Sequence, residues 1–304
     1  MKLGAIGTAG NAVLFGVVLM LFGDFLFALN DAMGKWLVAS FSVGQVLVMR
    51  SLGSFVMLTP MIARQGRDGL FRLERPSLQI LRVVLTTVDV ALFYAAVAYL
   101  PLADVITFYM AGPIYIAALS HFFLGETIGW RRWLAVVIGF LGVIIALRPS
   151  SAMLSWPAIF ALIGSLSFAL TLILGRRLRQ TSDVTLVTWQ TVGALVAGAV
   201  LSIGNWSPMS SLDLFAMLGL GIVAASAHML ITRSLKLAPA SLLAPLQYSL
   251  LLWAIVLGYL FFGDLPDRQV LVGSAVIVLA GLFIFHRKKV VSGIPADDVA
   301  PDGH

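Results

Sequence analysis

The sequence predicts an all-α integral membrane protein whose ten transmembrane helices form two inverted repeats of five helices. Three observations carry this prediction: an apolar composition, ten apolar stretches, and a match of the chain with itself. Hydrophobic residues make up 60% of the 304 residues and charged residues 11%, against about 45–50% and about 25% in soluble domains. The mean hydropathy is +0.99. So few charged side chains cannot cover a water-facing surface.

The composition also excludes several functions. The chain has no cysteine, so it holds no disulfide, no cysteine-based metal site and no catalytic thiolate. The formal net charge of +6 could suggest nucleic-acid binding, but the basic residues lie in the short loops between apolar stretches, where membrane topology explains them. We expect no nucleic-acid partner and no cofactor.

Ten apolar stretches are predicted to span the membrane, because about 20 mainly apolar residues cross roughly 30 Å of hydrocarbon as a helix. They lie at residues 13–38, 43–63, 78–99, 103–123, 133–147, 154–174, 185–203, 212–232, 242–262 and 270–285. The first stretch contains two aspartates and no small-residue cleavage site follows it, so we expect a retained helix rather than a signal peptide. Residues 290–304 are predicted to form a solvated tail.

The positions of lysine and arginine predict the orientation, because cytoplasmic loops are enriched in both. With the N-terminus in the cytoplasm, fifteen of the 20 basic residues fall on the cytoplasmic side and three on the opposite side. The fifteen are Lys2, Arg64, Arg67, Arg72, Arg75, Arg131, Arg132, Arg176, Arg177, Arg179, Arg233, Lys236, Arg287, Lys288 and Lys289. Both termini are therefore predicted to be cytoplasmic.

The two halves of the chain match each other in order. The matching pairs at an offset of 141 residues are Gly23 with Gly164, Phe27 with Phe168, Ala28 with Ala169, Leu29 with Leu170, Gly34 with Gly175, Lys35 with Arg176 and Leu37 with Leu178. The predicted repeats cover residues 13–148 and 154–289, and the cytoplasmic tail covers 290–304. Each repeat has an odd number of spans, so the second enters the membrane from the opposite side. Inverted repeats recur in secondary transporters, with the site near the midplane between them.

This ordered set of residues resembles the drug/metabolite transporter superfamily, in its EamA-type branch. The residues that carry the resemblance run from Phe27 to Lys35 and from Phe168 to Arg177, with Gly125-Glu126-Thr127 after the fourth span and Gly263-Asp264 after the ninth. The resemblance implies a bacterial inner-membrane protein with a central cavity lined by spans 1, 3, 4, 6, 8 and 9. Within the branch, the chain is similar to bacterial amino-acid exporters, including the aromatic amino-acid exporter, and to uptake carriers for adenosylmethionine or riboflavin.

Two aspartates lie deep in predicted spans. Asp24 and Asp89 are each 11 residues from the inner end of their span, which places them about 17 Å into the membrane. A charged side chain there costs about 2.5–3.5 kcal/mol on insertion scales. Both are therefore candidates for proton coupling and Asp89 also for substrate binding, although a capped structural aspartate would look the same in sequence.

A second charged group is predicted near the outer face. Asp31 and Lys35 are four residues apart and share a helix face, and Arg50 lies about as deep in the second span as Asp31 does in the first. We expect an Asp31–Arg50 ion pair, and the three residues are either structural or a gate. Arg82 lies a few residues into the third span, so its side chain is expected to reach the cytoplasmic headgroups.

Proline interrupts two predicted spans, at Pro113 and Pro245, and frees the carbonyl four residues earlier. Such carbonyls are tolerated at membrane depth where they line a cavity. Tyr109 and Gln247 are equivalent at an offset of 138 residues, so both are predicted near the central axis as substrate contacts. The other candidate substrate-binding residues are Asn30, Asp89, Tyr94, Phe168 and His228, although single histidines and aromatic residues inside bundles commonly only pack.

The predicted function is a secondary transporter that moves small metabolites by alternating access, most favourably amino acids in the outward direction. The alternative is an uptake carrier for a larger metabolite such as adenosylmethionine or riboflavin. An intramembrane aspartyl protease is disfavoured because Asp24 lacks a Gly-x-Gly-Asp context. The expected partners are a small-molecule substrate and the lipid bilayer.

Small-residue spacings such as Gly139, Gly142 and Ala146 allow close helix packing and could also form a homodimer face.

Overall fold

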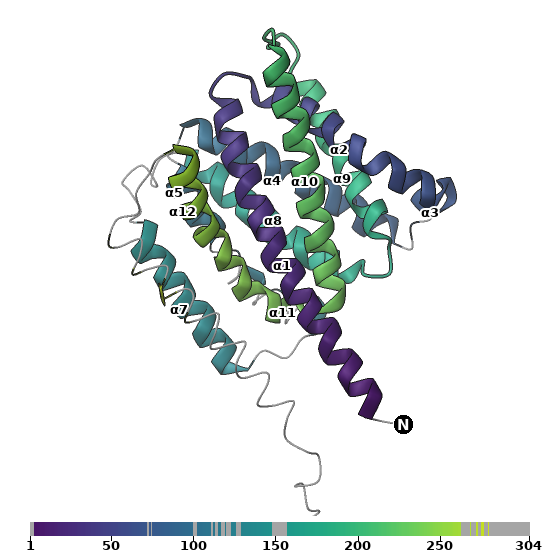
Figure 1. Ribbon diagram of the computed structural model, residues 1–304, viewed down its shortest axis with the longest axis vertical. Helices are drawn as coiled ribbons and strands as arrows, with labels where there is room; N and C mark the ends of the chain where they lie inside the picture. Colours follow the sequence, from purple (N-terminus) through teal and green to yellow (C-terminus); the bar gives the residue numbers. More distant parts are fainter. Residues whose placement is uncertain are drawn as a thin grey trace, which may run out of the picture.

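The computed structural model describes residues 3–71, 73, 75–99, 102–110, 112, 115, 116, 119, 123–125, 129–147, 157–262, 268, 272, 275, 276 and 279. These residues form helices and connecting turns without a β-strand. The helices are α1 (Leu3–Val38), α2 (Val43–Gln65), α3 (Arg67–Phe71), α4 (Pro76–Tyr99), α5 (Leu102–Tyr109), α7 (Trp130–Leu147), α8 (Pro157–Arg177), α9 (Asp183–Leu201), α10 (Ser211–Leu237), α11 (Ala240–Leu243), the 3-10 helix η2 (Ala244–Tyr248) and α12 (Ser249–Phe262). Figure 1 shows them packed as a bundle, with α7 along one side.

Six helices in the described residues are long and apolar enough to cross a membrane. They are Asn11–Val38, Val43–Gln65, Pro76–Tyr99, Pro157–Arg177, Asp183–Leu201 and Ser211–Leu237. These correspond to expected spans one to three and six to eight, and α7 corresponds to the fifth. Helix α1 begins about ten residues earlier than expected, and the short α3 in the first basic loop was not expected.

Some sequence predictions fall outside the described residues. They are the tenth span apart from four isolated positions, the tail at 290–304, most of the fourth span after Met110, and the residues Pro113, Glu126, Thr127, Gly263 and Asp264. The predicted interruption of the ninth span is confirmed, since residues 244–248 form the 3-10 helix η2 between α11 and α12. The structure therefore replaces one long span with three short helical segments at this point.

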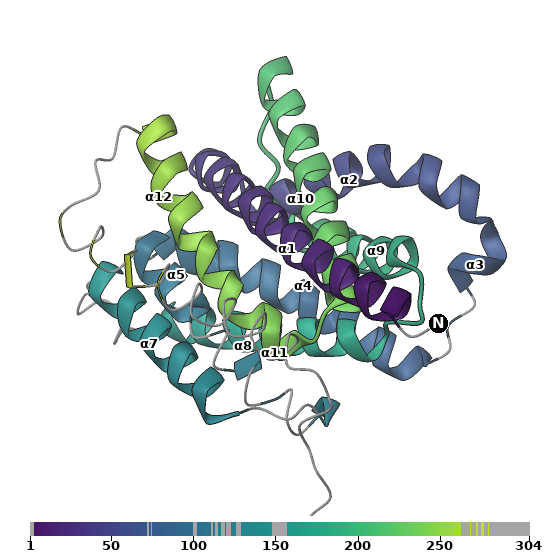
Figure 2. The same cartoon turned by 60° about the horizontal axis from the view of Figure 1, so that its bottom comes forward.

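Helices distant in sequence lie side by side in the bundle. Helix α1 packs along α10, α4 along α8, and α2 between α9 and α10 (Figures 1 and 2). Helices α4 and α8 are antiparallel, because Thr86 and Thr171 bond across them at 3.3 Å while Gly164 lies beside Leu92.

Small residues bring several of these helices into direct contact. A Cβ atom on Gly53 of α2 would lie 2.1 Å from the Leu218 carbonyl oxygen of α10, and one on Gly139 would lie 2.4 Å from the Tyr248 ring. Both contacts are possible only because glycine has no side chain. The contact at Gly139 agrees with the packing role predicted for this residue.

The outside of the bundle is apolar and much of its polar content is inside. Exposed large side chains occur on several helices, for example Phe15, Val56, Val196, Phe215 and Leu260. Buried polar side chains include Asp24, Arg50, Asp89 and Gln247. This reversal of the usual soluble pattern is what a bilayer requires of the surface that contacts its hydrocarbon.

Candidate functional site

A cavity lies among the helices of the bundle. Its walls come from α1, α2, α4, α5, α8, α10, η2 and α12. The lining residues are Asp24, Phe27, Asn30, Asp31, Arg50, Asp89, Val90, Phe93, Tyr94, Ile106, Tyr109, Met110, Phe168, His228, Gln247 and Leu250. Every site residue predicted from the sequence is brought together here except Lys35, which is exposed near the end of α1.

One wall holds Asp89 in the middle of α4. Its side chain is buried, and its Oδ1 atom accepts a 2.7 Å hydrogen bond from the Tyr109 hydroxyl at the end of α5. The Tyr109 hydroxyl lies against Gly164 of α8, where a Cβ atom would come within 2.4 Å of it. The glycine therefore leaves the space in which the tyrosine reaches the carboxylate.

Another part of the lining holds Asp24 of α1, which is 3% exposed. Its Oδ2 atom accepts a 2.9 Å hydrogen bond from the hydroxyl of Ser249, the first residue of α12. Sequence reasoning missed Ser249, although its place directly after the break at Pro245 was an available signal. Each of the two deep carboxylates is thus bonded by a residue at the end of a short helical segment.

The predicted Asp31–Arg50 ion pair is wrong, since the described residues show Asn30 between the two side chains. The Arg50 Nε atom donates to the Asn30 Oδ1 atom at 3.3 Å, and the Asn30 Nδ2 atom donates to the Asp31 Oδ1 atom at 3.1 Å. An amide can accept from a guanidinium and donate to a carboxylate at once. The neutral amide of Asn30 therefore links the charges of Arg50 and Asp31. The sequence predicted Asn30 only as a substrate contact.

Aromatic rings line the cavity in a continuous series. Phe27 contacts His228 and Phe168 edge to face, with ring centroids 4.9 Å and 6.0 Å apart. Phe168 contacts Tyr109 at 6.1 Å, and Tyr109 contacts Phe93 at 5.3 Å. Phe27 and Phe168 are the residues paired by the 141-residue offset. Phe93 was missed, although it lies four residues after Asp89 and so shares its helix face.

A smaller polar pocket of about 300 Å³ adjoins the main cavity between α2, α4, α9 and α10. It shares Arg50, Val90 and His228 with the main cavity and is also lined by Thr86 and Gln190. The Gln190 Oε1 atom is buried and accepts no hydrogen bond from the described residues. A buried polar atom without a partner costs about 1–3 kcal/mol, so water is the expected occupant of this pocket.

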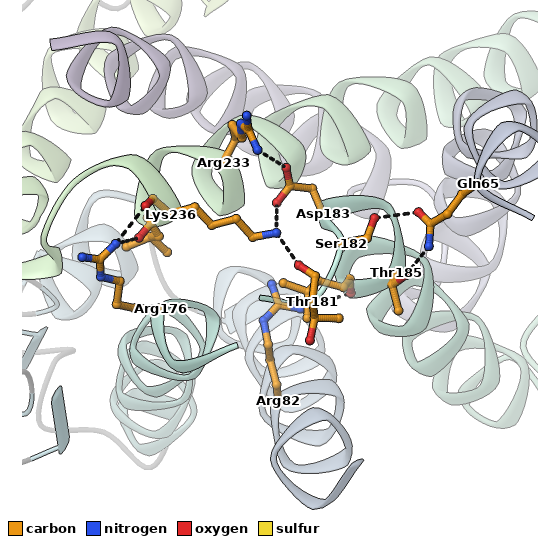
Figure 3. Close-up of polar contacts among 11 residues, drawn as sticks. Gln65, Arg82, Arg176, Thr181, Ser182, Asp183, Thr185, Arg233 and Lys236 are labelled. Carbon is orange, nitrogen blue, oxygen red and sulfur yellow. Dashed lines mark hydrogen bonds and ion pairs between the residues drawn. The ribbon is translucent and has the colours of Figure 1, made fainter. Parts of the chain in front are cut away.

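Polar contacts join helices around the start of α9, at the end of the bundle predicted to be cytoplasmic (Figure 3). The Asp183 carboxylate is paired with Lys236 at 2.6 Å and with Arg233 at 3.7 Å. The Gln65 side chain accepts a 2.6 Å bond from the Ser182 hydroxyl and donates a 2.7 Å bond to Thr185. These contacts join the start of α9 to the ends of α2 and α10.

The prediction that the Arg82 side chain reaches the cytoplasmic headgroups is wrong. Instead of reaching outward to lipid headgroups, its side chain is 3% exposed and donates a 3.1 Å hydrogen bond to the Leu186 carbonyl of α9. The side chain enters the bundle because α9 offers it a main-chain acceptor. The nearby Gln79 and Thr188 side chains are also buried and have no hydrogen-bond partner among the described residues.

Corresponding contacts lie at the other end, around the start of α2. The Ser42 hydroxyl donates a 2.8 Å bond to the Asn205 carbonyl, and the Gln45 side chain exchanges two bonds with the Ser207 backbone at 2.8 Å and 2.9 Å. The start of α2 is thus fastened to the loop after α9, as the start of α9 is fastened to the end of α2.

The cavity combines an excess of carboxylates with aromatic surface. Three carboxyl groups and one guanidinium line it, together with a single histidine. Within the described part of the chain, no group of three or more side chains is arranged to hold a metal ion. Such a lining suits a small organic molecule that carries positive charge and a planar ring.

The EamA-like transporter family matches the chain twice, over residues 14–148 and 155–286. The chain therefore belongs to the EamA-like transporter family, and it is a multi-pass membrane transporter of this type.

Three relatives illustrate the range of named functions in this family. An S-adenosylmethionine uptake transporter of Rickettsia bellii is 24% identical over 261 residues, covering 86% of this chain and 89% of its own. A riboflavin transporter of Rhizobium johnstonii is 27% identical over 279 residues, covering 90% and 91%. A pseudopaline exporter of Pseudomonas aeruginosa is 26% identical over 280 residues, covering 90% and 97%. A crystal structure of another protein superposes with a TM-score of 0.75 at 17% identity, covering 92% of this chain and 99% of that one.

Proposed function

We propose that this protein is a secondary transporter of the bacterial inner membrane that carries zwitterionic metabolites with an α-amino-acid group and a planar ring, with S-adenosylmethionine as the first candidate. The observation that carries the proposal is the central cavity, in which Asp24, Asp31 and Asp89 stand against the single guanidinium of Arg50. The carboxylates favour a cationic centre on the substrate, and the guanidinium favours its carboxylate.

The aromatic lining of the cavity supports a substrate with a planar ring. Phe27, Phe168, Tyr109 and Phe93 form a connected wall, on which a planar ring or a cation can lie. S-adenosylmethionine carries an ammonium and a sulfonium cation, a carboxylate and an adenine ring, so it has a group for each part of this lining. The relatives named as S-adenosylmethionine uptake transporters support the choice of this substrate.

Aromatic amino acids are the second candidate, because they combine an ammonium, a carboxylate and a ring in a smaller molecule. Export of amino acids is the activity that the sequence resemblance favoured, and relatives from Pseudomonas aeruginosa are named as exporters of pseudopaline. Riboflavin has the planar ring but lacks the cation that three carboxylates would select, so the cavity favours it least.

The arrangement of the two ends supports an alternating-access mechanism. Contacts at the start of α2 join it to the second half of the chain, and contacts at the start of α9 join it to the first half. An inverted repeat would produce such exchanged contacts, and opening one set while the other holds would expose the cavity to one compartment at a time.

The test is a counterflow assay in proteoliposomes with labelled S-adenosylmethionine, aromatic amino acids and riboflavin, run with and without a pH gradient. We expect S-adenosylmethionine to exchange without ATP, and the Asp89→Asn and Asp24→Asn variants to slow exchange about tenfold or more, as loss of a charge-assisted bond implies. Asp68→Asn is the matched control, because Asp68 is exposed in α3 and does not line the cavity.

Two results would count against the proposal, and a third would add proton coupling to it. Exchange of riboflavin alone would refute the charged-substrate assignment. Equal rates for Asp68→Asn and Asp89→Asn would refute the cavity as the site. A pH gradient that drives accumulation in the wild type but not in Asp24→Asn would support proton coupling through that residue.

A further inference from the structure

An arginine-lined groove lies at the α8 end of the bundle, outside the central cavity. It is lined by Arg75, Phe123, Leu124, Gly125, Arg176, Arg177, Arg179 and Gln180. Helices α4 and α8 are antiparallel neighbours, so the residue before the start of α4 meets the residues at the end of α8. The groove therefore lies where the two halves of the chain adjoin.

Main-chain contacts hold two of the groove arginines in place. The Arg177 Nε atom donates a 2.7 Å hydrogen bond to the Phe123 carbonyl. The Arg176 side chain donates bonds of 2.6 Å and 3.1 Å to the Leu235 and Lys236 carbonyls at the end of α10. A guanidinium has five N–H donors, so Arg177 keeps further donors for a ligand after making its main-chain bond.

Among the described residues that line the groove, four are arginines and none is a carboxylate. Elsewhere at this end, Asp183 neutralises Lys236 and Arg233. Arg75, Arg177 and Arg179 are exposed, and within the described part of the chain they form no ion pair. Guanidinium groups of this kind bind phosphate oxygens in a bidentate geometry.

We propose that this groove binds the headgroup of an anionic phospholipid. Phosphate is the group that the arginines recognise, and the neighbouring Phe123 side chain is 42% exposed, which suits the apolar part of a lipid rather than a free anion. The predicted orientation puts the groove at the cytoplasmic leaflet, where anionic lipids are found and basic pockets between helices bind their headgroups. Topology alone requires basic residues at this face but does not require them to converge on one groove.

Native mass spectrometry of the purified full-length protein with phosphatidylglycerol or phosphatidylcholine tests the proposal. We expect preferential retention of phosphatidylglycerol, and a loss of about fivefold in its affinity for each of Arg75→Gln and Arg179→Gln. Arg179→Lys keeps the charge and should retain most of the binding. Arg64→Gln is the matched control, because Arg64 is exposed near the end of α2, on the same predicted side, but does not line the groove.

Other outcomes would overturn the proposal. An equal loss for Arg64→Gln would mean a diffuse attraction of the basic face to anionic lipid. Displacement of the lipid by millimolar inorganic phosphate would identify a free-anion site instead. Equal retention of the two lipids would show that the groove does not select an anionic headgroup. The measurement needs no transported substrate, so its result is independent of the proposed transport function.

Discussion

The Tyr109 hydroxyl donates a 2.7 Å hydrogen bond to the Asp89 carboxylate, and this bond joins the end of α5 to the middle of α4 at the wall of the cavity. The same tyrosine ring contacts both Phe93 and Phe168. Tyr109 is therefore the residue through which the charged and the aromatic parts of the cavity meet, and four tests follow from this and related contacts.

Replacing Tyr109 with Phe should keep the ring contacts and remove only the donor to Asp89. Because the hydroxyl holds the Asp89 carboxylate at the cavity wall, we expect counterflow to slow about tenfold or more. A hydrogen bond to a charged group contributes about 1.5–3 kcal/mol to stability, so the melting temperature should also fall by a few degrees. Tyr259→Phe is the control, since Tyr259 is 51% exposed on the outer surface. Equal rates for the two variants would show that the Tyr109 hydroxyl has no part in transport.

Gly164→Ala should also disturb the hydrogen bond from Tyr109 to Asp89, because Gly164 of α8 lies against the Tyr109 hydroxyl. The added Cβ atom would lie 2.4 Å from the Tyr109 hydroxyl oxygen, whereas a Cβ atom on Gly219 would meet nothing closer than the Met33 methyl carbon at 3.9 Å. We expect Gly164→Ala to slow transport and Gly219→Ala to leave it unchanged. In a Tyr109→Phe background the Gly164→Ala substitution should have almost no further effect, and an additive loss would contradict this explanation.

The Asn30 bridge predicts strong coupling between its neighbours. Since Asn30 links Arg50 to Asp31, Asn30→Ala and Arg50→Gln should each lower transport, and the double variant should be little worse than either single one. A double-mutant cycle on the counterflow rate measures this directly. Independent, additive losses would mean that the bridge is not how Arg50 acts.

The buried polar residues between α4 and α9 should be reached by water during transport. The chain has no cysteine, so single-cysteine variants can be labelled without background. We expect a water-soluble thiol reagent to modify Gln190→Cys on the order of ten times faster than Val196→Cys, because the thiolate that reacts forms only in water. Val196 lies on the same helix but is 59% exposed on the apolar outer surface. Similar rates would argue against a water-filled pocket at Gln190.

Much of the candidate site could be predicted from the sequence because charge is rare in this chain. Asp24, Asp89 and Arg50 stand out as ionisable residues in apolar stretches, and each lines the cavity. The offset that pairs Phe27 with Phe168 also identified two rings that touch in the structure. The substrate assignment, the orientation and the role of Lys35 stay predictions.

The sequence by itself determined the membrane class, the approximate positions of most helices and the break near Pro245, since these follow from local hydropathy and from the chemistry of single residues. Only the tertiary structure decided which polar groups meet. Whether Arg50 bonds Asp31 or Asn30, and whether Arg82 turns toward lipid or toward the Leu186 carbonyl, depends on how the helices are rotated against each other. That rotation is set by contacts between residues far apart in the chain, such as Gly53 against Leu218, and no local pattern encodes it.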